Sequence, residues 1–176
     1  MRRRSLIKGF LPAALFAGPA VLYAETYLSV EQAQQLLLPG ASLSKTFVTL
    51  TDAQKSTIEK ASGVRVRDAQ VKAWRSGKGE WFIADNVVGK HEFIDFALAL
   101  TRDGAVKGVE IMTYRETYGG EVKNPKWRSQ FTGKKLDSPV KIDKDIKNIS
   151  GATLSSVHIT DGVRRLLNTW ALVLNS

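Results

Sequence analysis

The chain has 176 residues, no cysteine and a formal net charge of +9 at pH 7. Because it has no cysteine, it forms no disulfide, holds no iron–sulfur cluster and attaches no haem through thioethers, so any redox chemistry needs an organic cofactor or a partner. The basic charge does not indicate nucleic-acid binding, since no aromatic and basic recognition motif accompanies it.

The first 24 residues have the composition of an export signal. A start with four basic residues precedes an uncharged apolar stretch at 9–23, and Ala24 suits a cleavage site. Residues 3–8, RRSLIK, resemble a twin-arginine signal, and an ordinary secretory signal is the alternative. A retained membrane anchor is less favoured, because a spanning helix needs about 20 apolar residues. We expect export to the periplasm, with a net charge of +5 once the four basic residues are removed.

A first short helix is predicted over residues 29–38. Ser29 and Gln32 have the spacing of a capping box, and Pro39 follows the last helical residue. The apolar face of this helix would carry Ala33, Leu36 and Leu37.

A second helix is predicted to begin after Thr51, which forms another capping box with Gln54. Gly63 is a natural end for this helix, because glycine adopts the left-handed conformation common after the last helical turn.

The middle of the chain predicts an antiparallel meander. Glycine-containing turns separate apolar stretches at 71–75, 81–88, 93–101 and 106–114. Asp103-Gly104 is a two-residue hairpin signal between the last two stretches. The pattern contains no series of βαβ units, which argues against a doubly wound nucleotide-binding fold.

The last apolar segment predicts a helix from Leu154 onwards, locally weakened by Gly162. Its broad apolar face would be formed by Leu154, Val157, Ile159, Val163, Leu166, Leu167 and Trp170.

Small hydroxyl residues around a glycine come directly before this helix, in the sequence Ser150-Gly151-Ala152-Thr153-Leu154-Ser155-Ser156. Gly151 permits a tight turn, and either Ser150 or Thr153 would cap the helix. A helix N-terminus favours a phosphate, because its N–H groups are free and its dipole is positive there. From spacing alone, an ordinary N-cap turn leading into a core helix is the simpler interpretation.

The same seven residues resemble the flavinylation motif of the FMN-binding domain family. The resemblance implies that a periplasmic flavin transferase esterifies flavin mononucleotide (FMN) to Thr153 through a phosphoester. It also makes Ser150, Gly151, Ala152, Leu154, Ser155 and Ser156 candidate cofactor-binding residues. The family usually has an aspartate three residues before the serine, where this chain has Lys147, with Asp145 two residues earlier.

A second segment, Glu116-Thr117-Tyr118-Gly119-Gly120, is similar to the family's Glu-Thr-Pro-Gly segment. Trp127, Gln130, Phe131 and Gly133 resemble the stretch that follows it in the family. The resemblance implies that this loop lies beside the isoalloxazine ring, which makes Glu116, Thr117, Gly119 and Gly120 candidate binding residues. The alternative for this segment alone is a polar surface loop next to a buried tryptophan.

Other chemistry-bearing residues are weaker candidates. His91 and His158 are far apart in sequence and predict no metal site, and no catalytic triad is recognised. The basic residues that could pair with a phosphate or a partner, although a surface role is simpler, are Lys134, Lys135, Lys141, Lys147, Arg164 and Arg165. The four tryptophans, Trp74, Trp81, Trp127 and Trp170, are expected mainly in the core.

We therefore expect an α+β protein in which a twisted antiparallel sheet packs with helices. The expected organisation is an export signal at 1–24, an N-terminal helical segment at 25–66 and an FMN-binding domain at 67–176. The expected function is that of a monomeric periplasmic redox carrier with covalent FMN. Its partners would be a flavin transferase and membrane or periplasmic redox proteins, and it would associate with a membrane redox chain. Alternatives are a flavin-dependent reductase of a small substrate and a cofactor-free binding or assembly module.

Overall fold

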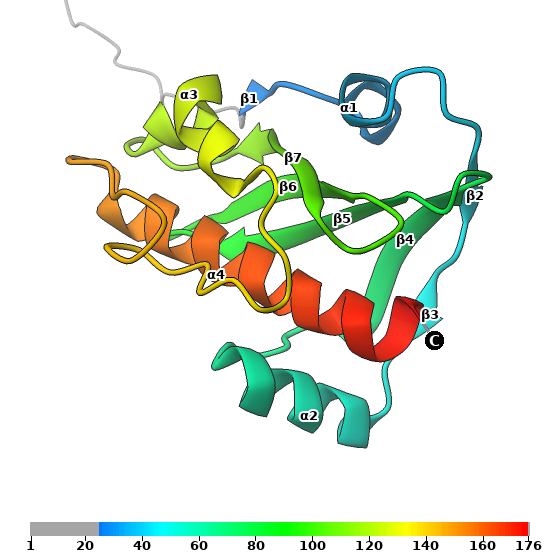
Figure 1. The fold of residues 1–176 in the computed structure, drawn as a ribbon. Coiled ribbons are helices and arrows are strands. Elements are labelled where there is room, and N and C mark those ends of the chain that lie inside the picture. Colours follow the sequence, from blue (N-terminus) through cyan, green and yellow to red (C-terminus); the bar gives the residue numbers. More distant parts are fainter. Residues whose placement is uncertain (1–24, 176) are drawn as a thin grey trace, which may run out of the picture.

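The computed structural model describes residues 25–175, and the predicted export signal at 1–24 lies outside this range (Figure 1). Within the described range, no helix is both long enough and apolar enough to cross a membrane.

An antiparallel sheet forms the centre of the molecule, in the order β1-β7-β6-β5-β4-β2, with β3 paired to β4. The strands are β1 (Glu25–Thr26), β2 (Leu43–Lys45), β3 (Val48–Thr49), β4 (Gln70–Ser76), β5 (Trp81–Val88), β6 (Phe93–Leu100) and β7 (Val106–Tyr114). The strands β4 to β7 are the predicted meander, and the predicted α+β class is confirmed. The short strands at both edges come from the N-terminal part of the chain, which therefore belongs to the same sheet.

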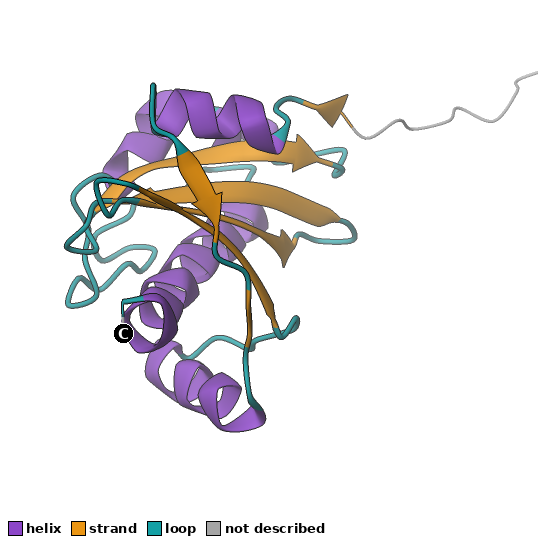
Figure 2. Cartoon of the chain, turned by 90° about the vertical axis from the view of Figure 1, so that its right-hand side faces the viewer, coloured by secondary structure: helices purple, strands orange, loops and turns teal. Residues whose placement is uncertain are grey.

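Helices cover both faces of this sheet, as Figures 1 and 2 show. The α-helices are α1 (Val30–Leu37), α2 (Asp52–Ser62), α3 (Pro125–Arg128) and α4 (Thr153–Thr169). Three short helical segments of other types are the 3₁₀-helices η1 (Gly120–Lys123) and η2 (Ser129–Phe131) and the π-helical η3 (Trp170–Leu174). The helix α1 lies on one face, α4 crosses the other, and α2 packs on the far side of α4 (Figure 2).

The two predicted N-terminal helices begin where their capping boxes place them. Ser29 with Gln32 and Thr51 with Gln54 form reciprocal side-chain and backbone hydrogen bonds, and Gly63 ends α2 with φ of 68°. The prediction that Leu36 lies on the buried face of α1 is wrong, because this side chain is 60% exposed. Leu38, directly after the helix, is buried in its place, since the chain turns toward the sheet there.

The sheet separates two hydrophobic cores according to the alternation of side chains along each strand. Along β6, Ile94, Phe96 and Leu98 face the large core beneath α4, whereas Ala97 and Ala99 face the smaller core beneath α1. Because both faces are buried, β6 is apolar at almost every position, and this explains its imperfect alternation in the sequence.

The hairpin between β6 and β7 is present, but its loop differs from the prediction. The N–H of Thr101 donates to the carbonyl of Ala105, so the loop holds three residues, Arg102 to Gly104, where two were predicted. A glycine at the third position suits this longer loop.

The helix α4 lies very close to the sheet at Gly162. A Cβ atom at this position would be 2.8 Å from Val87 Cγ1 and 2.9 Å from Phe96 Cζ. The residue that weakens the helix by propensity is therefore the residue that allows its close approach to β5 and β6.

Candidate functional site

The chain enters α4 through a turn that no side chain caps. Gly151 has φ of 86°, a left-handed conformation that glycine adopts at low cost, and Ala152 is the N-cap residue. The prediction that Ser150 or Thr153 caps the helix is wrong. The helix begins one residue earlier than predicted, at Thr153, whose own backbone is already helical.

The hydroxyl groups of this segment divide into exposed and buried ones. Ser150 and Thr153 are exposed, whereas Ser155 and Ser156 are 5% and 0% exposed. Ser156 Oγ lies 2.8 Å from Asn148 Oδ1, so this hydroxyl fixes the turn. Within residues 25–175, no hydrogen bond engages the Thr153 hydroxyl, which leaves it accessible for modification.

The loop at 116–120 lies against the first turn of α4. Tyr114, at the end of β7, places its hydroxyl 2.8 Å from Ser155 Oγ and donates a hydrogen bond to the carbonyl of Tyr118. Gly119 fits against both hydroxyls with φ of 93°, and a Cβ here would be 2.6 Å from Tyr114 Oη and 2.7 Å from Ser155 Oγ. The structure therefore brings together the two segments that the sequence analysis selected, although their binding roles stay predictions.

Burial raises the pKa of the Tyr114 phenol, and the hydrogen bond from Ser155 only partly opposes this effect. The phenol therefore stays protonated at neutral pH and keeps its donor for the Tyr118 carbonyl.

Glu116 anchors the start of this loop to the turn between β5 and β6. Its Oε1 accepts hydrogen bonds from the N–H groups of His91, at 2.5 Å, and Glu92, at 3.0 Å. Burial of the carboxyl group raises its pKa, but the backbone N–H groups outweigh this effect and hold the pKa below its usual value. Glu116 thus has a positioning role that the sequence analysis did not assign to it.

Apolar side chains are exposed around the predicted attachment point. Tyr118 is 84% exposed and Leu154 is 47% exposed. The prediction that Leu154 belongs to the buried face of α4 is therefore wrong, since it lies in the first turn beyond the edge of the core. Thr117 is also exposed, and Gly120 begins η1.

The segment after η1 holds the backbone at Lys147, where the family usually has an aspartate. Trp127 Nε1 donates to the Lys147 carbonyl at 2.7 Å, and Gln130 Oε1 accepts from the Lys147 N–H at 2.8 Å. The Lys147 side chain is exposed. Asp145 does not replace the missing aspartate, because its carboxylate accepts from the N–H groups of Val140 and Lys141 and pairs with Lys134.

The four tryptophans are all buried, as expected.

The two arginines of α4, Arg164 and Arg165, form ion pairs within the fold, whereas a surface role was the simpler expectation. Arg165 is 7% exposed and forms an ion pair with Asp85 at 3.0 Å, while Arg164 pairs with Asp161 at 2.7 Å. Burial raises the pKa of Asp85, against the effect of the Arg165 guanidinium. Asp85, a charged residue inside the predicted apolar strand 81–88, is the feature of the sequence that could have indicated this pair.

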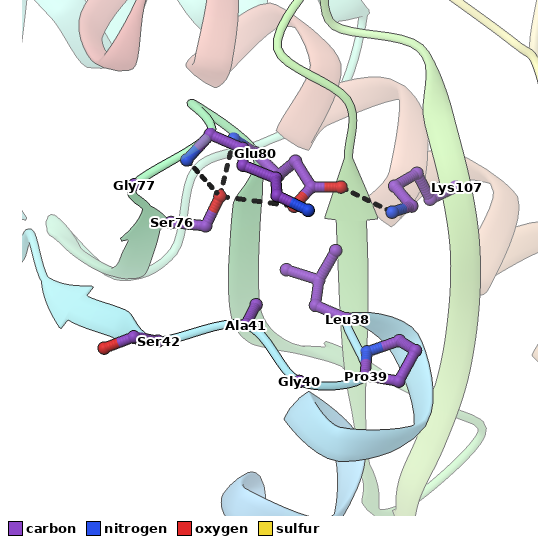
Figure 3. Close-up of a pocket in the computed structure, with 10 residues that line it drawn as sticks. Leu38, Pro39, Gly40, Ala41, Ser42, Ser76, Gly77, Glu80 and Lys107 are labelled. Carbon is purple, nitrogen blue, oxygen red and sulfur yellow. Dashed lines mark hydrogen bonds and ion pairs between the residues drawn. The ribbon is translucent and has the colours of Figure 1, made fainter.

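A pocket of about 340 Å³ lies at another part of the molecule, between the chain after α1 and the turn that joins β4 to β5 (Figure 3). Glu80 lines it and forms an ion pair with Lys107, while the Ser76 hydroxyl accepts from the N–H groups of Lys78 and Glu80. None of the predicted cofactor-binding residues lines this pocket.

Comparison with known families identifies the domain that carries this site. Residues 89–168 match the FMN-binding domain family, and this range includes both the loop at 116–120 and the start of α4. This part of the chain is therefore similar to an FMN-binding domain.

The particular relatives are components of one enzyme complex. The chain is 36% identical over 90 residues to the C subunit of the Na(+)-translocating NADH-quinone reductase from Vibrio vulnificus and 34% identical to that from Vibrio anguillarum. These matches cover 42% of this chain and 34% of each relative, so the chain spans about a third of the relatives' length. The crystal structure of the corresponding protein from Parabacteroides distasonis has the same fold, with a TM-score of 0.52 at 18% identity over 76% of this chain and 78% of that one.

Proposed function

We propose that the protein carries FMN esterified to Thr153 and moves electrons in the periplasm. The observation that carries this proposal is the exposed Thr153 hydroxyl at the uncapped start of a 17-residue helix. A phosphate at this point meets free backbone N–H groups and the positive end of the helix dipole. The residues present therefore fit a cofactor attached through its phosphate.

The loop at 116–120 would hold the flavin ring. Gly120 has no side chain to obstruct the ring and Thr117 offers an exposed hydroxyl, while the buried Gly119 packs against Tyr114 and Ser155. Ser155 and Glu116 fix this loop against α4 and against the turn before β6. When bound, FMN supplies the electron-transfer chemistry, and these protein groups orient the ring.

The protein would act as a carrier between redox partners. Its relatives belong to a Na(+)-translocating NADH-quinone reductase, which supports exchange of electrons with membrane or periplasmic redox proteins. Attachment would need a flavin transferase, because a threonine hydroxyl without an adjacent base is a poor nucleophile.

Intact mass after expression with and without a flavin transferase tests the attachment. The transferase should increase the mass by one FMN less one water, and Thr153→Ala should abolish the increment. Thr132→Ala is the matched control, since Thr132 is another exposed threonine outside the site. An unmodified wild-type chain, in cells where the transferase modifies a known substrate, would contradict the proposal.

Cell fractionation tests the location. The mature chain should appear in the periplasmic or membrane fraction, and replacing Arg3 and Arg4 by lysine should retain it inside the cell if the twin-arginine route is used. Unchanged export of the double variant, with loss of export when the apolar stretch 9–23 is interrupted, would instead assign the ordinary secretory route.

A further inference from the structure

A second pocket, of about 200 Å³, lies between the chain that follows α2, the end of β5 and the middle of α4. Arg65, Arg67, His158, Asp161 and Arg165 contribute its polar side chains. Neither Thr153 nor the loop at 116–120 lines it, so this pocket is separate from the predicted cofactor-binding residues.

The pocket has an excess of positive charge. Asp161 is neutralised by Arg164, and Arg165 by Asp85. Arg65 and Arg67 are exposed, and within residues 25–175 neither guanidinium has an acidic partner or a hydrogen bond. Two guanidinium groups therefore face solvent here without compensating carboxylates.

Two of the residues that line the pocket also have buried polar atoms that lack a partner. Arg165 is more than nine-tenths buried, and its Nε has no acceptor among the described residues. His158 Nδ1 is likewise buried without a partner in the described part of the chain. Buried polar atoms without hydrogen-bond partners are uncommon in folded proteins, because each costs free energy comparable to a lost hydrogen bond.

We propose that this pocket binds a small anion that carries carboxylate or phosphate oxygens. Such oxygens would pair with the planar donor arrays of Arg65 and Arg67 and, once the lining side chains shift to expose Arg165 Nε and His158 Nδ1, would supply partners for these two atoms. A volume of about 200 Å³ is below the range of about 300–1,000 Å³ usual for drug-sized ligands, which favours inorganic phosphate or a short dicarboxylate over a nucleotide. This binding does not require the flavin.

Titration by NMR and calorimetry tests the site, with inorganic phosphate and succinate as probes and sodium chloride holding the ionic strength constant. The full exported chain would be used in its flavinylated form and as Thr153→Ala, so that failure of flavin attachment and failure of anion binding are seen separately. We expect saturable shifts of the Arg165 Nε–H and His158 imidazole signals in both forms. Phosphate binding alone would assign a phosphate site, and succinate binding alone a dicarboxylate site.

The variants Arg65→Gln and Arg67→Gln should each weaken binding about tenfold, because each removes a charge-assisted interaction. Both side chains are exposed, so the fold should tolerate these changes. Arg102→Gln is the matched control, since it removes the same charge from the hairpin between β6 and β7. Non-saturable shifts with both probes, or equal weakening by Arg102→Gln, would overturn the proposal.

Discussion

The hydroxyl of Tyr114 lies 2.8 Å from the hydroxyl of Ser155, and this contact joins the end of β7 to the first turn of α4. The two residues are 41 positions apart in sequence. The contact fixes the distance between the loop at 116–120 and Thr153, so the geometry of the predicted flavin site depends on it.

Gly119→Ala should disturb this contact directly. The added Cβ would lie within 2.7 Å of both hydroxyls, and alanine at φ of 93° is strained, so we expect a loss of stability of about 3 kcal/mol in urea unfolding. Gly133→Ala is the matched control, because Gly133 has φ of 80° but open space around it, and it should cost about 1 kcal/mol. Equal losses in the two variants would show that backbone strain alone matters at Gly119.

Gly162→Ala should also destabilise the protein, although alanine is the better helix former. The gain in helix propensity is about 1 kcal/mol, whereas overpacking against Val87 and Phe96 costs about 1–3 kcal/mol. The balance can be measured by chemical denaturation, and the added variant Phe96→Leu should recover part of the loss by making room. A stabilised Gly162→Ala protein would mean that α4 moves away from the sheet at little cost.

Asp85→Asn should be strongly destabilising. The change leaves the buried Arg165 guanidinium without a counter-charge, for which about 3 kcal/mol is a reasonable expectation. Asp95→Asn is the control, because it breaks the more exposed ion pair with Arg115 and should cost about 1 kcal/mol or less. Similar unfolding free energies for the two variants would show that Arg165 finds another partner or reaches water.

The carboxyl group of Asp103, in the hairpin between β6 and β7, should have a pKa below its usual value. Hydrogen bonds from the Lys135 ammonium and the Thr101 hydroxyl lower the pKa of Asp103 from 3.8 to about 2. The folded state therefore binds fewer protons than the unfolded state between these values. The contribution of Asp103 to stability is present above about pH 4 and is lost as the pH falls toward 2. Carboxyl NMR titration measures this pKa.

In the variant Lys135→Gln, the Asp103 pKa should move back toward 3.8, because the hydrogen bond from the Lys135 ammonium lowers this pKa more than any other contact. Lys60→Gln, on α2, is the control and should leave it unchanged. An unchanged pKa in Lys135→Gln would mean that the Thr101 hydroxyl and the backbone account for the shift.

Features that depend on neighbouring residues were predictable from the sequence. The capping boxes at Ser29 and Thr51 and the end of α2 at Gly63 involve residues a few positions apart, and each lies where the sequence places it. The four strands of the meander were predictable for the same reason, because their apolar runs and turn residues are local signals.

Features that depend on packing between distant segments were not predictable. The burial of Arg165 requires Asp85 on β5, and the positioning role of Glu116 requires the backbone of His91 and Glu92. The segment at 150–156 and the loop at 116–120 could be selected separately. Their contact depends on Tyr114, which lies at the end of a predicted strand. Nothing in the local sequence indicates that the hydroxyl of this tyrosine contacts a distant helix.

Replacing Lys147 by aspartate restores the residue that is usual in the family motif and tests whether this departure affects flavin attachment. The backbone at this position is held by Trp127 and Gln130, and the side chain is exposed, so Lys147→Asp should leave the turn unchanged. If a flavin transferase reads the aspartate, the variant should gain FMN several-fold faster at limiting transferase, as followed by intact mass.

The matched control for this change is Lys144→Asp, which introduces the same charge three residues earlier on another exposed side chain. Faster modification of both variants would assign the effect to net charge. Equal modification of Lys147→Asp and the wild type would show that the turn around Gly151 and the hydroxyl of Thr153 are sufficient for recognition.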